Sequence, residues 1–319
     1  MVLSPVNRTD AQNCELRREK ICNLLTRKIH PSLSFEYFPP KTDVGLLNLE
    51  KRIHSMADMN PLWIDVTFGA GGSTSERSFQ ICNDAAQDVG LNVMMHLTCT
   101  NMHVKDIHSI LTRLKSAGIR NVLALRGDPP AGVAEWEACD GGFRHACDLV
   151  KYIRSQFGDY FCIAVAGYPE GHADCESYEQ DLLYLKEKVD AGADLIITQL
   201  FYDTEAYFSY VKRLSALGVI VPVIPGVMPI MSFASLQRMT TMCKVSVPET
   251  LRSALEPIKE NDKAVSDFGV QFATRMCMEL IHGGAPGVHL YTMNHEDSVR
   301  EIVRGISPIL PPINTEWIR

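Results

Sequence analysis

Short apolar runs alternate with amphipathic segments along most of the chain. The amphipathic segments carry apolar side chains at i, i+3, i+4 and i+7, as at Ile107, Ile110, Leu111 and Leu114, which is the spacing of one helix face. A glycine stands where each helix should end, and a strand-like apolar run follows it. The pattern therefore predicts repeated units of a helix followed by a strand, in which each helix packs one stripe against a sheet.

Eight apolar runs are expected to be β-strands. They cover residues 33–38, 62–67, 90–96, 118–125, 158–165, 192–199, 218–225 and 288–292. Apolar strands that are nearly all followed by a helix favour a parallel sheet covered on both faces. The number of strands and the length of 319 residues favour an α/β fold of the closed (βα)8 TIM-barrel type over an open doubly wound sheet.

One domain is predicted. Residues 1–30 are expected to form a helical or irregular extension, residues 31–307 the (βα)8 barrel, and residues 308–319 an irregular tail. Two or three extra helices must fit into residues 232–284, between the seventh and eighth strands, where Pro248 and Pro257 interrupt the helical pattern. The sequence contains no stretch rich in Ser, Gly or Pro that would mark a linker to a second domain.

Composition and charge narrow the class of partner. The chain is 46% hydrophobic and 22% charged, which is ordinary for a soluble protein. A net charge of -7 and a pI near 5.8 give no electrostatic reason to expect nucleic acid or an anionic membrane surface. The ten cysteines include no CxxC pair, and the sequence shows neither a signal peptide nor a bilayer-spanning apolar run. We therefore expect a cytoplasmic protein with reduced thiols and a small-molecule partner.

Polar residues close the predicted strands. In a (βα)8 barrel, the carboxyl ends of the strands and the loops that follow carry the chemistry. The closing residues are Glu36, Thr67, His96, Arg126 with Asp128, Tyr168, Gln199, the turn Pro225-Gly226, and Tyr291. A barrel with a purely structural role would not need this set, so this rim is predicted to hold the functional site.

Glu36 is the candidate general acid. It lies in an apolar, aromatic run that Pro39 and Pro40 stop. A carboxyl group in such surroundings is costly to ionise, which raises its pKa toward neutrality and suits it to deliver a proton. The alternative is a solvent-facing glutamate on an edge strand.

Other patterns have two interpretations each. Arg126 and Asp128 suit a phosphate and the N–H donors of a heterocycle, or they pair with each other and pin a loop. Asp181, Tyr184 and Lys188 share one helix stripe, which either lies along an elongated ligand or faces solvent. The glycine-rich residues 69–72 precede a capping box, which favours helix capping over phosphate binding.

No metal site is predicted from the sequence. His96, Cys99 and His103 lie close together along the chain, but no second cluster completes a set of four ligands. No predicted strand ends in lysine, which argues against a Schiff-base aldolase.

Eight separated motifs resemble those of the methylenetetrahydrofolate reductase family and occur in the family's order. They are SFEYFPPKT, DVTFGAGGSTSE, HLTC, NVLALRGDPP, AGYPEGH, DLLYLKEKVDAGADLIITQLFYD, IPGVMPI and HLYTMN. The resemblance covers about residues 33–306. It implies a (βα)8 barrel with FAD across the carboxyl ends of the strands. It also implies a ping-pong reduction of 5,10-methylenetetrahydrofolate to 5-methyltetrahydrofolate by NADPH or NADH, in one-carbon metabolism and methionine supply.

The resemblance also implies residue roles. Glu36 matches the family's proton donor, Asp128 the second catalytic residue, near the pterin and the flavin, Gln199 a pterin contact and Tyr291 a substrate contact. The positions that match FAD-binding residues are Thr67, Phe68, His96, Leu125, Arg126, Gly127, Asp128, His145, Ala146, Ala166, Tyr168, His172, Asp174, Asp181, Tyr184 and Lys188.

Three positions depart from the family pattern. Ser235 and Met239 stand where bacterial members carry a glutamine and an aromatic residue that contact folate, and His295 stands where many members have arginine. The sequence therefore does not fix the contacts of the folate tail. It also does not fix the preference between NADH and NADPH, or whether the chain forms a homo-oligomer. The chain ends before the S-adenosylmethionine-sensing domain of longer eukaryotic members could begin, so feedback inhibition by that route is expected to be absent.

Two other functions fit the same barrel. One is another flavin-dependent barrel enzyme, for example a proline-dehydrogenase-like enzyme, which substrate screening would separate. The other is a non-catalytic folate-binding or regulatory subunit. The presence of Glu36, Asp128 and Gln199 argues against this second alternative.

Overall fold

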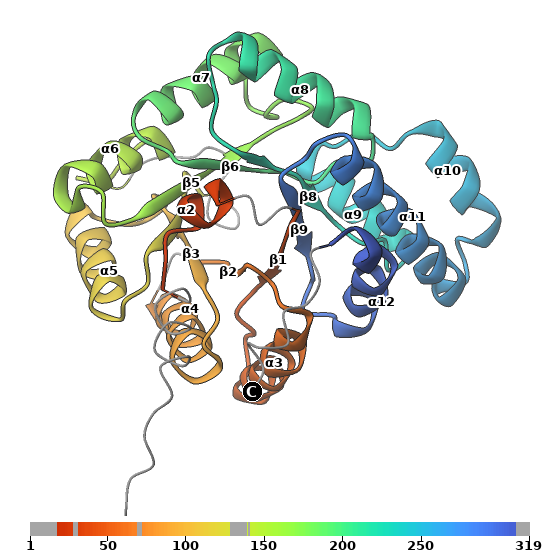
Figure 1. Ribbon diagram of the computed structural model, residues 1–319, viewed down its shortest axis with the longest axis horizontal. Helices are drawn as coiled ribbons and strands as arrows, with labels where there is room; N and C mark the ends of the chain where they lie inside the picture. The colour runs from red at the N-terminus through yellow and green to blue at the C-terminus, as the bar shows by residue number, and fades with distance from the viewer. Residues whose placement is uncertain (1–17, 28–30, 69–71, 128–138, 140, 311–319) are drawn as a thin grey trace, which may run out of the picture.

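A ring of parallel strands surrounded by helices forms the molecule (Figure 1). The computed structural model describes residues 18–27, 31–68, 72–127, 139 and 141–310. The strands are β1 (Ser32–Tyr37), β2 (Trp63–Val66), β3 (Val93–Thr98), β4 (Asn121–Leu125), β5 (Cys162–Gly167), β6 (Leu195–Thr198), β7 (Val223–Ile224), β8 (Gly226–Val227) and β9 (Gly287–Tyr291). They pair in the order β7-β6-β5-β4-β3-β2-β1-β9-β8, with every pairing parallel.

The ring closes through Pro225. This residue alone separates β7 from β8, the two strands at the ends of the pairing order. Proline has no N–H to donate to a strand ladder, so the predicted seventh strand is split into two short strands. The Pro225 carbonyl still accepts a hydrogen bond from His289 N at 2.9 Å. The predicted (βα)8 barrel is thus confirmed, with its seventh strand broken at one residue.

Helices follow the strands and cover the outside of the ring. The main helices are α3 (Asp43–Met56), α4 (Gly72–Asp84), α5 (Val104–Ser116), α6 (Ala146–Phe157), α7 (Tyr178–Asp190), α8 (Thr204–Ala216), α9 (Phe233–Cys243), α10 (Glu249–Leu255), α11 (Asp262–His282) and α12 (Glu296–Ile306). Short turns of helix extend several of them: η1 (Ala57–Met59), η2 (Ala85–Val89), η3 (Glu256–Ile258) and η4 (Ser307–Ile309). The insertion predicted between the last two strands contains α9, α10 and α11, and Pro248 is the N-cap of α10.

Glycines end the helices as predicted. Gly90, Gly118, Gly158, Gly192 and Gly218 all have positive φ. A side chain is strained in this conformation, whereas glycine adopts it freely. Each glycine therefore stops the helical hydrogen-bond pattern and turns the chain back toward the next strand.

The apolar core has two layers because side chains alternate along each strand. On β1, Phe35 and Tyr37 pack outward against the helices, as does Ile64 on β2. Trp63 on β2 and Met94 on β3 belong instead to a cluster inside the ring. The side chains of one strand thus supply both the helix–sheet layer and the filling of the barrel.

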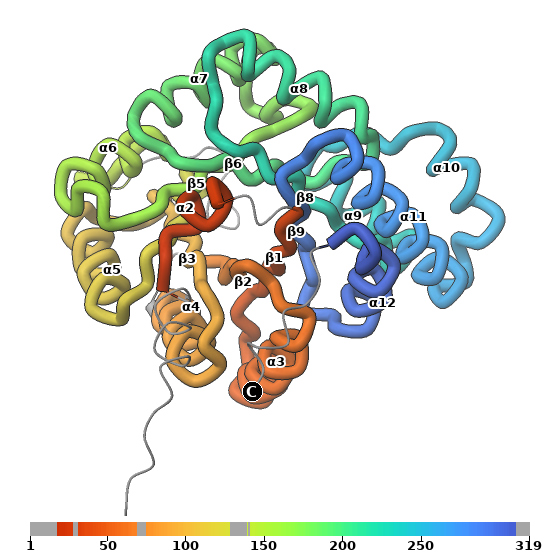
Figure 2. The backbone as a smooth tube through the Cα atoms, in the orientation of Figure 1, coloured from red at the N-terminus to blue at the C-terminus, as the bar shows by residue number. Residues whose placement is uncertain are grey.

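A short helix, α2 (Ile21–Thr26), lies across the amino-terminal end of the barrel. Ile21 and Leu25 are buried with the inward-facing strand residues, and Ile21 N donates to Asn121 Oδ1 at 2.8 Å. Figure 2 shows the helix lying over the centre of the ring. Full burial of an aliphatic side chain contributes roughly 1.5–3 kcal/mol, so burial of Ile21 and Leu25 favours the docked position of α2. The predicted domain division at residues 30 and 307 stays a prediction.

Within the described part of the chain, no helix is both long enough and apolar enough to cross a bilayer.

Candidate functional site

Carboxylates and imidazoles gather inside the barrel at the carboxyl ends of β1, β2, β3 and β9. Glu36 Oε2 lies 3.6 Å from His96 Nε2 and 3.6 Å from His289 Nε2. Asp65 Oδ2 lies 3.3 Å from His96 Nε2. The Asp65 and His289 side chains are fully buried, whereas 20% of the Glu36 side chain is exposed. Glu36 is therefore the member of this acid–imidazole cluster that a ligand at the barrel mouth can reach.

The surroundings of Glu36 differ from those expected from its sequence neighbours. Phe35 and Tyr37 point into the outer core, so they do not enclose the carboxyl group, which faces His96 and His289 instead. The edge-strand alternative is also wrong, because β1 pairs with β2 on one side and β9 on the other.

His96 is placed to be protonated. Burial disfavours the charged imidazole, but the hydrogen bond with Asp65 and the charges of Glu36 and Asp65 outweigh that effect and raise the pKa of His96. The folded pKa lies above the unfolded value, so the stabilisation from this group is fully present below about pH 6.5. It is lost as the pH rises through the folded pKa.

We expect the Asp65→Asn substitution to lower the pKa of His96. The amide removes the negative charge while leaving burial, which favours the neutral ring, in place. The measurement is an NMR titration of the imidazole in both proteins, with His108 on the outer surface as an internal reference. An unchanged His96 titration would show that Asp65 does not set its charge.

His289 is held by contacts on several sides. Its Nδ1 lies 2.9 Å from Ser34 Oγ, and its ring stacks on Trp63 with centroids 6.4 Å apart. The His289 and Tyr291 rings are perpendicular to each other, with centroids 5.2 Å apart. The Tyr291 hydroxyl donates a hydrogen bond to Thr198 O at 2.6 Å. Burial raises the pKa of Tyr291 well above its usual range, so the phenol stays neutral. The imidazole orientation facing Glu36 is thereby fixed.

Buried polar atoms without a hydrogen-bond partner mark the same region. Among the described residues they include Asp65 Oδ1, Thr98 Oγ1 and His289 Nε2, all on strands that line this end of the barrel. Leaving such an atom unsatisfied typically costs about 1–3 kcal/mol. Their convergence indicates that a ligand or ordered water belongs here.

A second polar group lies beyond β4 and β5. Arg126 Nη2 donates to Asp174 Oδ2 at 2.9 Å, and Asp174 N donates to His172 Nδ1 at 3.1 Å. The hydrogen bond from Arg126 lowers the pKa of Asp174, and burial lowers the pKa of His172. The His172 ring meets the Tyr168 ring edge-on at 4.6 Å. The structure thus brings together four residues that the family resemblance assigned to FAD.

Lys188 continues this group from α7. Its Nζ donates to Ala166 O at 2.8 Å and lies 5.9 Å from the centre of the Tyr168 ring. Burial lowers the pKa of Lys188 to about 8, against the opposing attraction of Asp181. Burial also raises the pKa of Asp181. Of the predicted stripe, Asp181 and Lys188 therefore face the protein, whereas Tyr184 is 51% exposed.

Gly127, between Arg126 and Asp128, has a structural reason to be glycine. Its φ is +87°, and a Cβ there would lie 2.5 Å from Thr100 Oγ1. A side chain would be both strained and too close to the end of β3. The glycine therefore lets the loop after β4 pack against the segment after β3.

The remaining predicted residues line the same end of the barrel with fewer contacts. Thr67 and Phe68 follow β2, Leu125 ends β4, and His145 and Ala146 are the N-cap and first residue of α6. Gln199 follows β6, and its Oε1 accepts from Leu200 N at 2.8 Å. Asp128 and residues 69–71 lie outside the described residues, so their predicted roles stay predictions.

The three positions that depart from the family pattern have local structural roles. Ser235 forms a reciprocal capping box with Ser232 at the start of α9. Met239 packs against an apolar cluster that includes residues of α9, α10 and α11, and His295 is the exposed N-cap of α12. These contacts explain the side chains without assigning them to a ligand.

Sequence reasoning missed Asp65, His289 and Ser34. The signal was available, because each residue lies two positions before a predicted strand-end residue and so points to the same face: Thr67, Tyr291 and Glu36. Only the strand ends were selected. Including the residue two positions before each strand end would have identified all three residues.

Two surface cavities lie among the helices, away from this cluster. One, of about 680 Å³, is bordered by Tyr202, Phe268 and Arg275, and the other, of about 630 Å³, by Phe233, Arg238 and Met242. Neither includes Glu36. They are therefore separate from the candidate site.

The fold and the cluster define a (βα)8-barrel protein with its polar groups where barrel enzymes carry their chemistry. The family model for methylenetetrahydrofolate reductase matches residues 20–307. The chain belongs to this family.

Curated relatives agree with the family assignment. The probable methylenetetrahydrofolate reductase (NADH) of Oryza sativa subsp. japonica is 48% identical, over 86% of this chain and 48% of that protein. Methylenetetrahydrofolate reductase (NADH) 1 of Arabidopsis thaliana is 46% identical, over 89% and 50%. The probable methylenetetrahydrofolate reductase (NADPH) of Caenorhabditis elegans is 37% identical, over 92% and 44%. The chain spans about half the length of these relatives.

Solved structures share the fold at low sequence identity. A Clostridium thermocellum protein that binds two copies of 5-methyl-5,6,7,8-tetrahydrofolic acid has a TM-score of 0.62 and 16% identity, covering 92% of this chain and 100% of its own. Dihydropteroate synthase from Xanthomonas albilineans, in complex with 7,8-dihydropteroate, has a TM-score of 0.50 and 13% identity, covering 88% and 94%. These likenesses support the barrel fold.

Proposed function

We propose that the chain reduces 5,10-methylenetetrahydrofolate to 5-methyltetrahydrofolate in the cytoplasm, with FAD as cofactor and NADPH or NADH as hydride donor. The product would enter one-carbon metabolism and methionine supply. Family membership supports the reaction. The observation that carries the proposal is the partly exposed Glu36 carboxyl, held between two imidazoles at the barrel mouth.

The residues after β4 and β5 and on α7 fit a dinucleotide such as FAD. Arg126 and Lys188 supply two cations, which suit the two phosphates of such a cofactor. Burial makes Lys188 hold its proton weakly, with a pKa of about 8, so a nearby phosphate would favour its charged form. Tyr168 and His172 add ring surfaces beside the cations. When bound, FAD would accept hydride from the nicotinamide and pass it to the folate.

Glu36 supplies the proton in the proposed reaction. Opening the imidazolidine ring of the folate requires protonation of a ring nitrogen. The Glu36 carboxyl is the reachable acid in the cluster, and the Nε2 atoms of His96 and His289 both lie 3.6 Å from the same carboxyl oxygen. A fixed donor avoids the cost of orienting an acid during the reaction.

Three other residues would position the folate. Gln199 accepts a hydrogen bond from Leu200 N through Oε1, which orients its amide, and the NH2 group would donate to the pterin. Tyr291 presents its ring at the mouth, because its hydroxyl is bonded to Thr198 O. Asp128 would place a negative charge near the cationic folate formed after ring opening.

Flavin content and turnover of the purified chain test this function. We expect bound FAD, oxidation of a reduced nicotinamide and formation of 5-methyltetrahydrofolate, with the ratio of initial rates for NADH and NADPH showing the preferred donor. Failure to retain or take up FAD would overturn the proposal. Oxidation of proline in place of folate reduction would indicate the other flavin barrel, and folate binding without turnover would indicate a non-catalytic subunit.

A further inference from the structure

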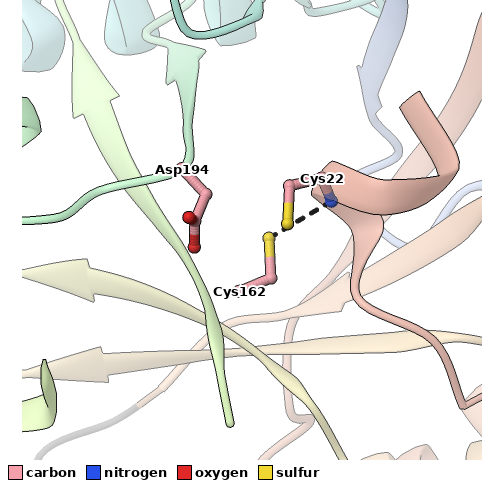
Figure 3. Close-up of side chains that lie close together, drawn as sticks. All are labelled: Cys22, Cys162 and Asp194. Atoms are coloured by element: carbon pink, nitrogen blue, oxygen red, sulfur yellow. Dashed lines mark hydrogen bonds between the residues drawn. The ribbon is translucent and has the colours of Figure 1, made fainter. Parts of the chain in front are cut away.

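Three side chains that can ligate a metal meet at the amino-terminal end of the barrel, opposite the candidate functional site. Cys22 lies on α2, Cys162 is the first residue of β5, and Asp194 directly precedes β6. Two sulfur atoms and one carboxylate oxygen, one atom from each residue, lie within 4.8 Å of one another. Figure 3 shows the two sulfur atoms side by side, with the carboxylate next to them.

Neighbouring groups hold the three side chains in place. Cys22 N donates to Cys162 Sγ at 3.4 Å, which ties α2 to β5. Asp194 Oδ2 accepts from Arg154 Nη2 at 2.5 Å and from Ile163 N at 2.8 Å. Both of these hydrogen bonds end on Oδ2 and fix the orientation of the carboxylate. Outer hydrogen bonds of this kind orient the ligands of metal sites.

We propose that Cys22, Cys162 and Asp194 bind one zinc ion, with a water molecule as the fourth ligand. Two thiolates with a carboxylate suit tetrahedral Zn²⁺, whereas Mg²⁺ and Ca²⁺ prefer oxygen ligands alone. Zinc–sulfur and zinc–oxygen bonds of about 2.3 and 2.1 Å place tetrahedral ligands roughly 3.6–3.8 Å apart. The ligand atoms lie within 4.8 Å of one another, so each separation has to shorten by at most about 1.2 Å.

The charges of such a site balance. Two thiolates and one carboxylate carry three negative charges, and Zn²⁺ with the bound Arg154 guanidinium carries three positive charges. A neutral set avoids the penalty of an uncompensated buried charge. Coordination releases the two thiol protons to solvent. Cys162 is fully buried, whereas 25% of the Asp194 side chain is exposed, which gives the ion a path of entry.

A zinc ion at this site would hold α2 against the amino-terminal end of the barrel. It would join α2 to the starts of β5 and β6, and binding that occurs only in the folded chain stabilises the fold. This role is independent of the proposed reductase activity, because the two sites lie at opposite ends of the strands. Spacing along the sequence does not reveal the site, since the three ligands come from segments far apart in the chain.

Metal binding to the full chain, purified with a reductant and dialysed free of metal, tests the proposal. Cobalt(II) serves as the probe, because a thiolate-to-cobalt charge-transfer band appears only when sulfur coordinates the ion. We expect one cobalt ion per chain with this band, displaced by one equivalent of Zn²⁺, and a higher melting temperature with Zn²⁺. Cys22→Ser should reduce the intensity of the band, because one of the two thiolates is lost, and should weaken Zn²⁺ binding by more than the 10- to about 100-fold typical of outer-shell changes.

Cys147→Ser is the matched control, because Cys147 is half-buried on α6 and lies outside the cluster. It should keep the band and the affinity. Cys162→Ala should behave as Cys22→Ser does, and circular dichroism verifies that each variant folds.

Glu36, Asp65 and His289 also lie close enough to hold an ion, but they offer no sulfur, so the band separates the two clusters. Absence of the band in the unaltered chain, or unchanged Zn²⁺ affinity in folded Cys22→Ser, would overturn the proposal.

Discussion

Replacing Glu36 with glutamine is expected to spare the oxidation of NADPH or NADH by the flavin and to slow folate reduction by about 10²- to 10⁴-fold. Glutamine keeps the size of the side chain but has no acidic proton to give. Only the second half-reaction requires that proton. Stopped-flow measurement of the flavin absorbance follows the two half-reactions separately and compares them between the two proteins.

Glu301→Gln is the control for this substitution. Glu301 is exposed on α12, so the same chemical change there should leave both half-reactions unaltered. An equal loss of both half-reactions in folded Glu36→Gln would contradict the assignment of Glu36 as the acid. It would indicate that the side chain holds the cluster of His96 and His289 together instead.

Replacing Lys188 with methionine is expected to weaken FAD binding by about 10- to 100-fold, equal to the roughly 1.5–3 kcal/mol of a hydrogen bond to a charged group. The pKa of Lys188 is about 8, so the amine is charged below that pH and neutral above it. An anionic phosphate prefers the charged form, and FAD affinity should therefore fall as the pH rises through about 8. In Lys188→Met this dependence should disappear. Titration of apoprotein with FAD by fluorescence measures both effects.

Lys186→Met is the matched control for Lys188→Met. Lys186 lies on the same helix, but it pairs with Asp190 at 2.5 Å on the outside of α7. Its loss should change neither the affinity for FAD nor the pH dependence. If the affinity of the unaltered chain for FAD stays constant between about pH 7 and pH 9, Lys188 does not contact the FAD phosphates, because Lys188 loses its proton in that pH range.

The repeated helix–strand units of this barrel could be read from the sequence with small errors. The run at residues 90–96 predicted a strand that the structure places at Val93–Thr98, and residues 192–199 became Leu195–Thr198. Such shifts are expected, because a turn and the strand after it merge in a single apolar pattern. The break at Pro225 was the larger difference. A local pattern does not say which neighbours a strand will pair with.

The candidate site was harder to predict than the fold. Selecting the residues that close the predicted strands identified Glu36, His96 and Tyr291, because the carboxyl ends of parallel strands lie at the same end of the barrel. It missed Asp65 and His289, which lie one inward-facing position deeper. This selection also left the partner of Arg126 open, and the structure shows Asp174, 48 residues further along, bonded to it.

The kind of fold and the family can be inferred from the amino-acid sequence, because helix and strand periods, helix-ending glycines and motifs are properties of neighbouring residues. Which side chains meet inside the barrel depends on how the distant segments of the chain pack together. Closure brings Glu36 between two imidazoles from different strands and sets Cys22 against Cys162 and Asp194. It also buries Lys188, which lowers its pKa. These properties depend on burial and distance across the ring, which no spacing along the chain contains.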